Sequence, residues 1–351
     1  MRSIEREIML KGIKQNLLKS AKSLKFFDLA SESAWRQNKL LILAYHGISL
    51  EDEHLWNSSL YMPPEVLRRR FEIIKQHDCI VLSLNEAVER LYNKTLPKKA
   101  VAITFDDGNY DFYQQALPII KEFDFPTTVY LTTFYSQYNK PVFAVAADYL
   151  LWKANFKVLD CNFLIGKNEQ IDLSFNHKRK RAHELIVAYA AENKLSAEQK
   201  NCLLERLCEN LQLDYAEFCR KRILQLMNRD EVAQVAAAGV DVQLHTHRHR
   251  VPLEEQSFKR EIEDNRAAIN RLTGKMAQHF CYPSGEFNPQ FFPWMKAQAV
   301  VSATTCETAL STADTNPFLL PRLVDTCSLS EIEFEGWLTG ISQFLPQRKK
   351  F

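Results

Sequence analysis

Two adjacent aspartates, Asp106 and Asp107, follow the short apolar run 100–103 and precede Gly108. An apolar run without alternation predicts a strand that is buried on both faces of a parallel sheet. In α/β folds the chemistry lies at the carboxyl ends of such strands, which is where this pair is expected. Because side chains alternate along a strand, one aspartate can bind a metal while the other moves a proton. A turn that caps the next helix is the alternative interpretation.

Three of the nine histidines lie within five residues, directly after a second strand-like run at 240–244. His245 and His249 are four positions apart, so their imidazoles share one face if the chain turns helical after the strand. Two such histidines and an aspartate can bind one divalent ion, with water in the open position. His247 and Arg248 are expected to point away from this ion. A solvated basic turn or a histidine satisfied in the core is the alternative.

The sequences Thr104-Phe105-Asp106-Asp107-Gly108 and His245-Thr246-x-x-His249 together resemble the polysaccharide deacetylase family, also called the NodB-homology domain or carbohydrate esterase family 4. The resemblance spans about residues 39–325, with one long interruption. Four further segments resemble family motifs in the same order: Leu43–Gly47, Leu226–Gly239, Phe280–Gly285 and Leu320–Arg322.

The resemblance implies a role for each residue of the site. Asp107, His245 and His249 would bind the metal. Asp106 would be the general base that takes a proton from the attacking water. The backbone N–H of Tyr282 would stabilise the developing oxyanion.

The chain departs from the usual family pattern at two positions. Many relatives take their general acid from a C-terminal Leu-x-His motif, but no histidine follows His279, so His46 on the first strand is expected to serve. Many relatives carry an arginine where this chain has Cys281, and Arg322 is expected to reach Asp106 from a neighbouring strand and keep it ionised. The alternatives are a buried structural histidine and an ordinary surface arginine.

Strands and helices are expected to alternate on both sides of the interruption, which indicates parallel βαβ units. We therefore predict an α/β fold, a distorted (β/α) barrel of the polysaccharide deacetylase type at residues 39–325. Helical periodicity and many charges predict an inserted helical subdomain at about 141–225, which can form a wall of the substrate groove or an oligomer contact. A C-terminal helix and a basic tail are expected at 326–351.

Residues 1–38 are expected to form a separate N-terminal segment. Apolar residues and basic residues alternate through its first 29 positions, which predicts a basic amphipathic helix. Such a helix most often packs its apolar face on its own domain. The other interpretation is peripheral contact with an anionic membrane surface.

Composition excludes several classes of protein. The 351 residues are 46% hydrophobic and 25% charged, as in ordinary globular proteins, and the net charge of +2 argues against a dedicated nucleic-acid binder. The eight cysteines form no Cys-x-x-Cys pair, and no secretory signal or membrane span is recognisable. These features predict a cytoplasmic protein with free thiols. A peripheral position at the inner face of the membrane is the other interpretation.

The expected activity is that of a metal-dependent polysaccharide N-deacetylase, a hydrolase that removes N-acetyl groups from amino sugars of a surface or exopolysaccharide. Two nitrogens and one oxygen suit Zn²⁺, although Co²⁺ or Ni²⁺ would bind the same set. Two alternatives remain: a metal-dependent amidase for a small non-carbohydrate acyl amide, and a non-catalytic glycan-binding relative. The sugar, its linkage, its chain length and the oligomeric state stay open.

Overall fold

The computed structural model describes the backbone of residues 2–345, and their side chains from residue 11 onward. Eight strands form the central sheet: β1 (Leu41–Tyr45), β4 (Ile80–Leu82), β5 (Ala100–Phe105), β6 (Thr127–Leu131), β9 (Asp241–Leu244), β10 (His279–Cys281), β11 (Ser302–Thr304) and β12 (Leu323–Val324). Their order is β11-β10-β9-β6-β5-β1-β12, with β4 also paired to β5, and all of these pairs are parallel.

The two ends of this sheet are joined by the segment 320–324. Leu320 forms a parallel bridge with Thr304 of β11, and β12 pairs with β1 only three residues later. The sheet therefore curls into the distorted (β/α) barrel that the sequence predicted, and that prediction is confirmed.

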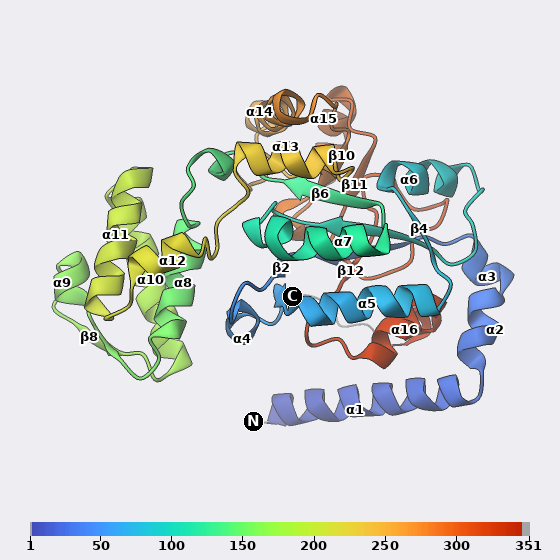
Figure 1. Cartoon of the computed structure of the whole chain (residues 1–351), viewed down its shortest axis with the longest axis horizontal. Coiled ribbons are helices and arrows are strands. Elements are labelled where there is room, and N and C mark those ends of the chain that lie inside the picture. Colours follow the sequence, from blue (N-terminus) through green and yellow to red (C-terminus); the bar gives the residue numbers. More distant parts are fainter. Residues whose placement is uncertain (1, 346–351) are drawn as a thin grey trace.

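Helices surround the barrel (Figure 1). They are α5 (Pro64–Gln76), α6 (Leu84–Tyr92), α7 (Leu117–Phe123) with the preceding π-turn η1 (Phe112–Ala116), α13 (Arg229–Ala237), α14 (Glu255–Thr273), α15 (Phe291–Ala297) and α16 (Glu331–Thr339). Every residue of β1 and β5 is buried: one set of side chains joins the core beneath the surrounding helices, and the alternating set packs in a second cluster with side chains of α6. Two-sided burial is the reason that these strands are continuous apolar runs.

The interior face of the strands leads directly to the predicted site. Along β5 the side chains of Ala102 and Thr104 alternate with those of Val101 and Ile103, which belong to the outer core. The same alternation continues to Asp106, which therefore points into the barrel mouth.

The interruption in the barrel forms a separate lobe on the left of Figure 1. It consists of α8 (Phe143–Lys153), α9 (Cys161–Ile165), α10 (Asn176–Glu192), α11 (Ala197–Asn210), α12 (Tyr215–Arg220) and an antiparallel hairpin of β7 (Val158–Asp160) and β8 (Gln170–Asp172). The lobe has its own hydrophobic core. The sequence predicted only helices here and missed the hairpin, because strands of three residues are too short to show an alternating pattern.

The loop that follows β1 packs against the lobe and links it to the barrel by side-chain hydrogen bonds. This loop contains the short parallel pair β2 (Gly47–Ile48) and β3 (Tyr61–Met62), and the helical turn α4 (Glu53–Trp56). Trp56 donates from Nε1 to Asp148 at 3.1 Å, and Tyr149 donates to Asp52 at 2.5 Å. Short 3₁₀ turns complete the fold at η2 (Tyr135–Gln137), η3 (Pro283–Gly285) and η4 (Ile341–Phe344).

The N-terminal segment differs from the prediction of one amphipathic helix. It forms three helices, α1 (Arg2–Ser23), α2 (Phe26–Glu32) and α3 (Ala34–Gln37), and the left-handed backbone of Lys25 (φ 59°) separates the first two. The face of α1 that contacts the barrel is mixed: Leu18 is buried against α16, and Lys14 and Lys22 pair with glutamates of α16. The predicted C-terminal helix corresponds to α16, whereas the basic tail after residue 345 lies outside the described residues. No helix within residues 2–345 is both long enough and apolar enough to cross a bilayer.

Candidate metal centre and active site

The two aspartates lie in a tight turn at the carboxyl end of β5. The N–H of Asp106 still donates to Tyr45 of β1 at 2.9 Å, but Asp107 and Gly108 have left-handed backbones with φ of 71° and 80°. A Cβ on Gly108 would lie 2.3 Å from Leu131, so the turn needs glycine for its space as well as for its backbone conformation. The turn sends the two carboxylates in different directions.

The histidines reach the same place by a route that the spacing did not predict. The segment after β9 is a loop and not a helix, with left-handed residues at Thr246 (φ 61°) and His249 (φ 54°). The assumption that His245 and His249 share a helix face is therefore wrong. The loop instead turns back on itself, so that both imidazoles face Asp107.

Asp107, His245 and His249 converge on one point. Oδ1 of Asp107 lies 3.2 Å from Nε2 of each histidine, and the three candidate ligand atoms lie within 4.8 Å of one another. Burial raises the pKa of Asp107, but hydrogen bonds from both histidines outweigh it and lower the pKa well below its usual range. The group combines two imidazole nitrogens with one carboxylate.

The protonation of His245 suits a metal ligand. Its Nδ1 lies 2.9 Å from the backbone carbonyl of Cys281, to which it donates. The carbonyl thus fixes a proton on Nδ1, so Nε2, which hydrogen-bonds Asp107 here, is the nitrogen that would give up its proton to bind a metal. This donor set fits a divalent cation such as Zn²⁺.

A second group of candidate ligands overlaps the first: Asp106, His245 and Cys281. Burial raises the pKa of the Cys281 thiol well above its usual range, so the thiolate that a metal requires is disfavoured. The carboxylate of Asp106 is also occupied by another partner. We therefore assign the metal to Asp107 and the two histidines.

That partner of Asp106 is Arg322. Nη1 and Nη2 of the guanidinium lie 2.7 Å from Oδ1 and Oδ2 of Asp106, and both side chains are buried. Burial raises the pKa of Asp106, but the charge and hydrogen bonds of Arg322 lower it to about 2. Nη2 also lies 3.1 Å from Sγ of Cys281, whose small side chain leaves room for the guanidinium. Asp106 is therefore held ionised in one orientation.

His46 lies beside this pair. Its Nε2 is 3.6 Å from Oδ2 of Asp106, and its side chain is 16% exposed. Burial lowers the pKa of His46, and the nearby carboxylate of Asp106 only partly offsets this. The ring is thus close enough to exchange a proton with the site and is neutral near pH 7.

The structure places Tyr282 differently from its predicted role. Its backbone N–H points to the carbonyl of Thr304 at 3.3 Å, as a continuation of the β10–β11 pairing. Its hydroxyl donates to the carbonyl of Phe318 at 3.1 Å. An N–H that already has an acceptor in the sheet is not free for an oxyanion, so the predicted role of Tyr282 is not supported.

Two residues of α14 hold the histidine loop, and the sequence reasoning missed them. The carboxylate of Glu261 accepts the backbone N–H of Arg248 at 2.8 Å and Nε of Arg250 at 2.8 Å. The side chain of Asn265 accepts the N–H of His245 at 3.0 Å and donates to the carbonyl of Leu131 at 2.9 Å.

A signal for these two residues was present in the sequence. Glu261 and Asn265 occupy the buried stripe of α14, among Phe258, Ile262 and Ile269. Polar residues on the apolar stripe of a helix need buried partners, and here those partners are the residues around the metal ligands. The side chains of His247 and Arg248 lie against Thr133 and Glu261 and not against Asp107.

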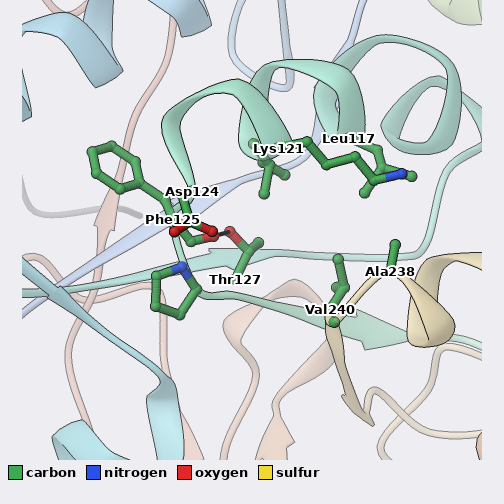
Figure 2. Close-up of a pocket in the computed structure, with 10 residues that line it drawn as sticks. Leu117, Lys121, Asp124, Phe125, Thr127, Ala238 and Val240 are labelled. Carbon is green, nitrogen blue, oxygen red and sulfur yellow. Dashed lines mark hydrogen bonds between the residues drawn. The ribbon is translucent and has the colours of Figure 1, made fainter.

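A pocket of about 380 Å³ lies at the other end of the barrel (Figure 2). It is formed by the end of α7 together with the residues that start β6 and precede β9, including Lys121, Thr127 and Val240. These positions are at the amino ends of the strands, whereas Asp106 and His245 are at the carboxyl ends. The pocket is therefore not part of the candidate active site.

Comparisons with known proteins agree with this geometry. The family model for polysaccharide deacetylase matches residues 93–150 and 196–300, on both sides of most of the inserted lobe. The poly-beta-1,6-N-acetyl-D-glucosamine N-deacetylase of Escherichia coli K12 is 30% identical over 100 residues, which are 28% of this chain and 15% of that protein. The enzyme of the same name from Staphylococcus epidermidis is 26% identical over 111 residues, 28% of this chain and 38% of that protein. The matched segment thus covers well under half of the length of each of these two relatives.

Solved structures share the fold. The Streptococcus pyogenes deacetylase PplD in complex with acetate has a TM-score of 0.56 at 18% identity, over 86% of this chain and 97% of that one. IcaB from Ammonifex degensii has a TM-score of 0.56 at 16% identity, with the same coverage of both chains. With a barrel of this type and both motif groups assembled at its mouth, the resemblance to the polysaccharide deacetylase family that the sequence indicated is confirmed.

Proposed function

We propose that this protein is a metal-dependent hydrolase that removes N-acetyl groups from a poly-N-acetylglucosamine type of exopolysaccharide, with Zn²⁺ as its metal. The observation that carries the proposal is the separation of roles between the aspartates. Asp107, His245 and His249 form a candidate metal site. Asp106 instead pairs with Arg322, which keeps its carboxylate ionised. The sugar is suggested by the names of the curated relatives from Escherichia coli and Staphylococcus epidermidis.

The residues of the site divide the reaction between them. Asp107, His245 and His249 would hold the divalent ion, which when bound would supply a Lewis acid for the acetyl carbonyl. Asp106 accepts the proton of the water that attacks the carbonyl carbon, and Arg322 keeps Asp106 able to do so. When the carbon–nitrogen bond breaks, His46 donates a proton to the leaving amine, and the products are acetate and a free amino sugar. Because His46 is neutral at rest, we infer that it receives its proton from Asp106 during turnover.

Acetate release tests the proposal. The full chain is incubated with β-1,6-linked N-acetylglucosamine oligosaccharides, with and without a chelator, and Zn²⁺, Co²⁺ or Ni²⁺ is then added back. We expect release that the chelator abolishes and the metal restores. Asp106→Asn should keep its metal and lose turnover by about 10²–10⁴-fold, the usual contribution of a general base. His249→Ala should lose both.

The same assay separates the alternatives. Release from small N-acetyl amides but not from oligosaccharides would assign the chain to the small-amide amidases. Oligosaccharide binding without chelator-sensitive release would make the protein a glycan-binding module and would end the hydrolase proposal.

A further inference from the structure

One face of α1 carries large apolar side chains that point away from the protein. Ile13, Leu17 and Leu24 are spaced at four and seven positions, which places them on one side of a helix. Leu24 follows the last residue of α1, but its N–H still bonds to the carbonyl of Ser20. The three side chains are 49%, 56% and 67% exposed. We call them the α1 stripe.

The opposite face of α1 is fixed to α16. Leu18 is fully buried, and Lys14 and Lys22 pair with Glu333 and Glu335, whose side chains are only 7% and 9% exposed. The lysines therefore hold the helix in an orientation that turns the α1 stripe outward. Figure 1 shows α1 at the lower edge of the molecule, next to α16 and remote from the inserted lobe.

The charge along the α1 stripe is mainly positive, although the exposed Asp28 follows it in α2. Residues 8–27 contain five lysines and no acidic residue. Lys25 directly follows Leu24 at the end of the stripe and is exposed, and so is Phe26 at the start of α2, at 52%, whereas Lys19 is exposed on another side of α1. Apolar side chains flanked by lysines are typical of helices that lie in the interface of anionic membranes.

A second copy of the chain fits this face less well. A symmetric dimer presents the same patch on both subunits, so it would bring the lysines of one α1 against those of the other. An anionic lipid surface complements both features of the face at once.

We propose that α1 docks this protein on anionic lipid membranes, with the α1 stripe and Phe26 buried among the acyl chains and Lys25 among the headgroups. The proposal is independent of the catalytic assignment. It refers only to residues on α1 and at the start of α2, and it gives the exposed leucines a partner.

Vesicle cosedimentation tests the docking. The full chain is mixed with vesicles of phosphatidylcholine containing phosphatidylglycerol, and with vesicles of phosphatidylcholine alone. We expect binding to the anionic vesicles and much weaker binding to the neutral ones. The double variant Leu17→Asn/Leu24→Asn should bind the anionic vesicles at least about ten-fold more weakly, because two buried leucines are lost. Lys19→Glu/Lys25→Glu should lower binding to the anionic vesicles only.

A matched control is available in two leucines elsewhere. Leu55 and Leu253 are 68% and 67% exposed, so Leu55→Asn/Leu253→Asn removes similar apolar surface away from α1 and should bind as the parent does. No binding by the parent, or equal binding by the parent and the Leu17/Leu24 variant, overturns the proposal. Self-association in analytical ultracentrifugation that the Leu17/Leu24 variant abolishes would assign the face to a second copy, and would also overturn it.

Discussion

Asp106 and Asp107 are neighbours in the chain, yet their carboxylates have unrelated partners. The left-handed backbone of Asp107 turns its side chain toward His245 and His249, whereas Asp106 continues the inward face of β5 and meets Arg322. The role of base that we propose for Asp106 requires a carboxylate that is ionised and does not bind the metal, and the pairing with Arg322 favours both. The geometry of single residues thus separates two chemically identical groups.

The pair of Asp106 and Arg322 predicts a pH effect. Lysine at position 322 keeps the charge but cannot form the two parallel hydrogen bonds, so burial should raise the pKa of Asp106 from about 2. The base is active above its pKa, so Arg322→Lys should lose activity at acidic pH first. We expect the acidic limb of its kcat/KM profile to move up by about one pH unit or more.

The control for this measurement is Arg68→Lys, which changes an exposed arginine paired with Glu122. Its profile should match that of the parent. An acidic limb that stays in place in Arg322→Lys would show that Arg322 does not set the ionisation of Asp106.

At the scale of elements, α14 determines where the histidine loop lies. Two consecutive loop residues bond to Glu261: its backbone carbonyl accepts the N–H of His247, and its carboxylate accepts groups of Arg248. His249 lies between Arg248 and Arg250, both of which the same carboxylate holds. A buried charge on a helix thus positions a metal ligand that it does not touch.

We therefore predict that Glu261→Gln weakens metal binding. Loss of the negative charge loosens the two arginines that flank His249, and second-shell changes of this kind typically cost about 10–100-fold in metal affinity or activity. The measurement is competition for Zn²⁺ with a chromophoric chelator. The visible spectrum of the Co²⁺-substituted protein reports whether the coordination changes.

Glu263→Gln is the matched control on the same helix, since Glu263 is exposed and accepts a hydrogen bond from Gln298 at 2.7 Å. It should bind Zn²⁺ as the parent does. If Glu261→Gln binds Zn²⁺ with the same affinity as the parent, the position of His249 does not depend on the contacts of the loop with α14.

At the scale of the whole molecule, the site joins segments that an entire lobe separates in the chain. The metal-binding groups follow β5 and β9, and in the sheet these two strands have only β6 between them. The inserted lobe buries its own apolar residues in a separate core, so it interrupts the sequence of the barrel without interrupting its packing. A metal that binds both strand ends would tie together two halves of the barrel.

Metal binding should therefore stabilise the whole fold. A ligand at 100 times its dissociation constant adds about 2.7 kcal/mol to the free energy of unfolding. For a protein of this size we expect the melting temperature to fall by about 5 °C on chelation and to recover with Zn²⁺. Scanning calorimetry of the parent and of His249→Ala checks this, and the variant should melt at the same temperature with and without chelator. A melting temperature of the parent that does not change on chelation would contradict the assigned metal site.

Much of the barrel and of the site could be predicted from local patterns. The runs at 100–103 and 240–244 are buried strands because both of their faces are covered, and polar residues at their ends lie at the same edge of a parallel sheet. The hairpin of the lobe, the left-handed loop of His249 and the occupied N–H of Tyr282 were missed. Each of these depends on which segment lies beside which, and no short window of sequence contains that information.

By itself the sequence determined that buried strands alternate with helices and that Asp107, His245 and His249 follow two of these strands, because an apolar run and the residues after it are properties of one segment; the barrel was expected from the family resemblance. Only the tertiary structure decided that Arg322 meets Asp106, that α14 holds the histidine loop, and that Lys14 and Lys22 of α1 pair with α16. These contacts join residues far apart in the chain, and their geometry exists only after the barrel has closed.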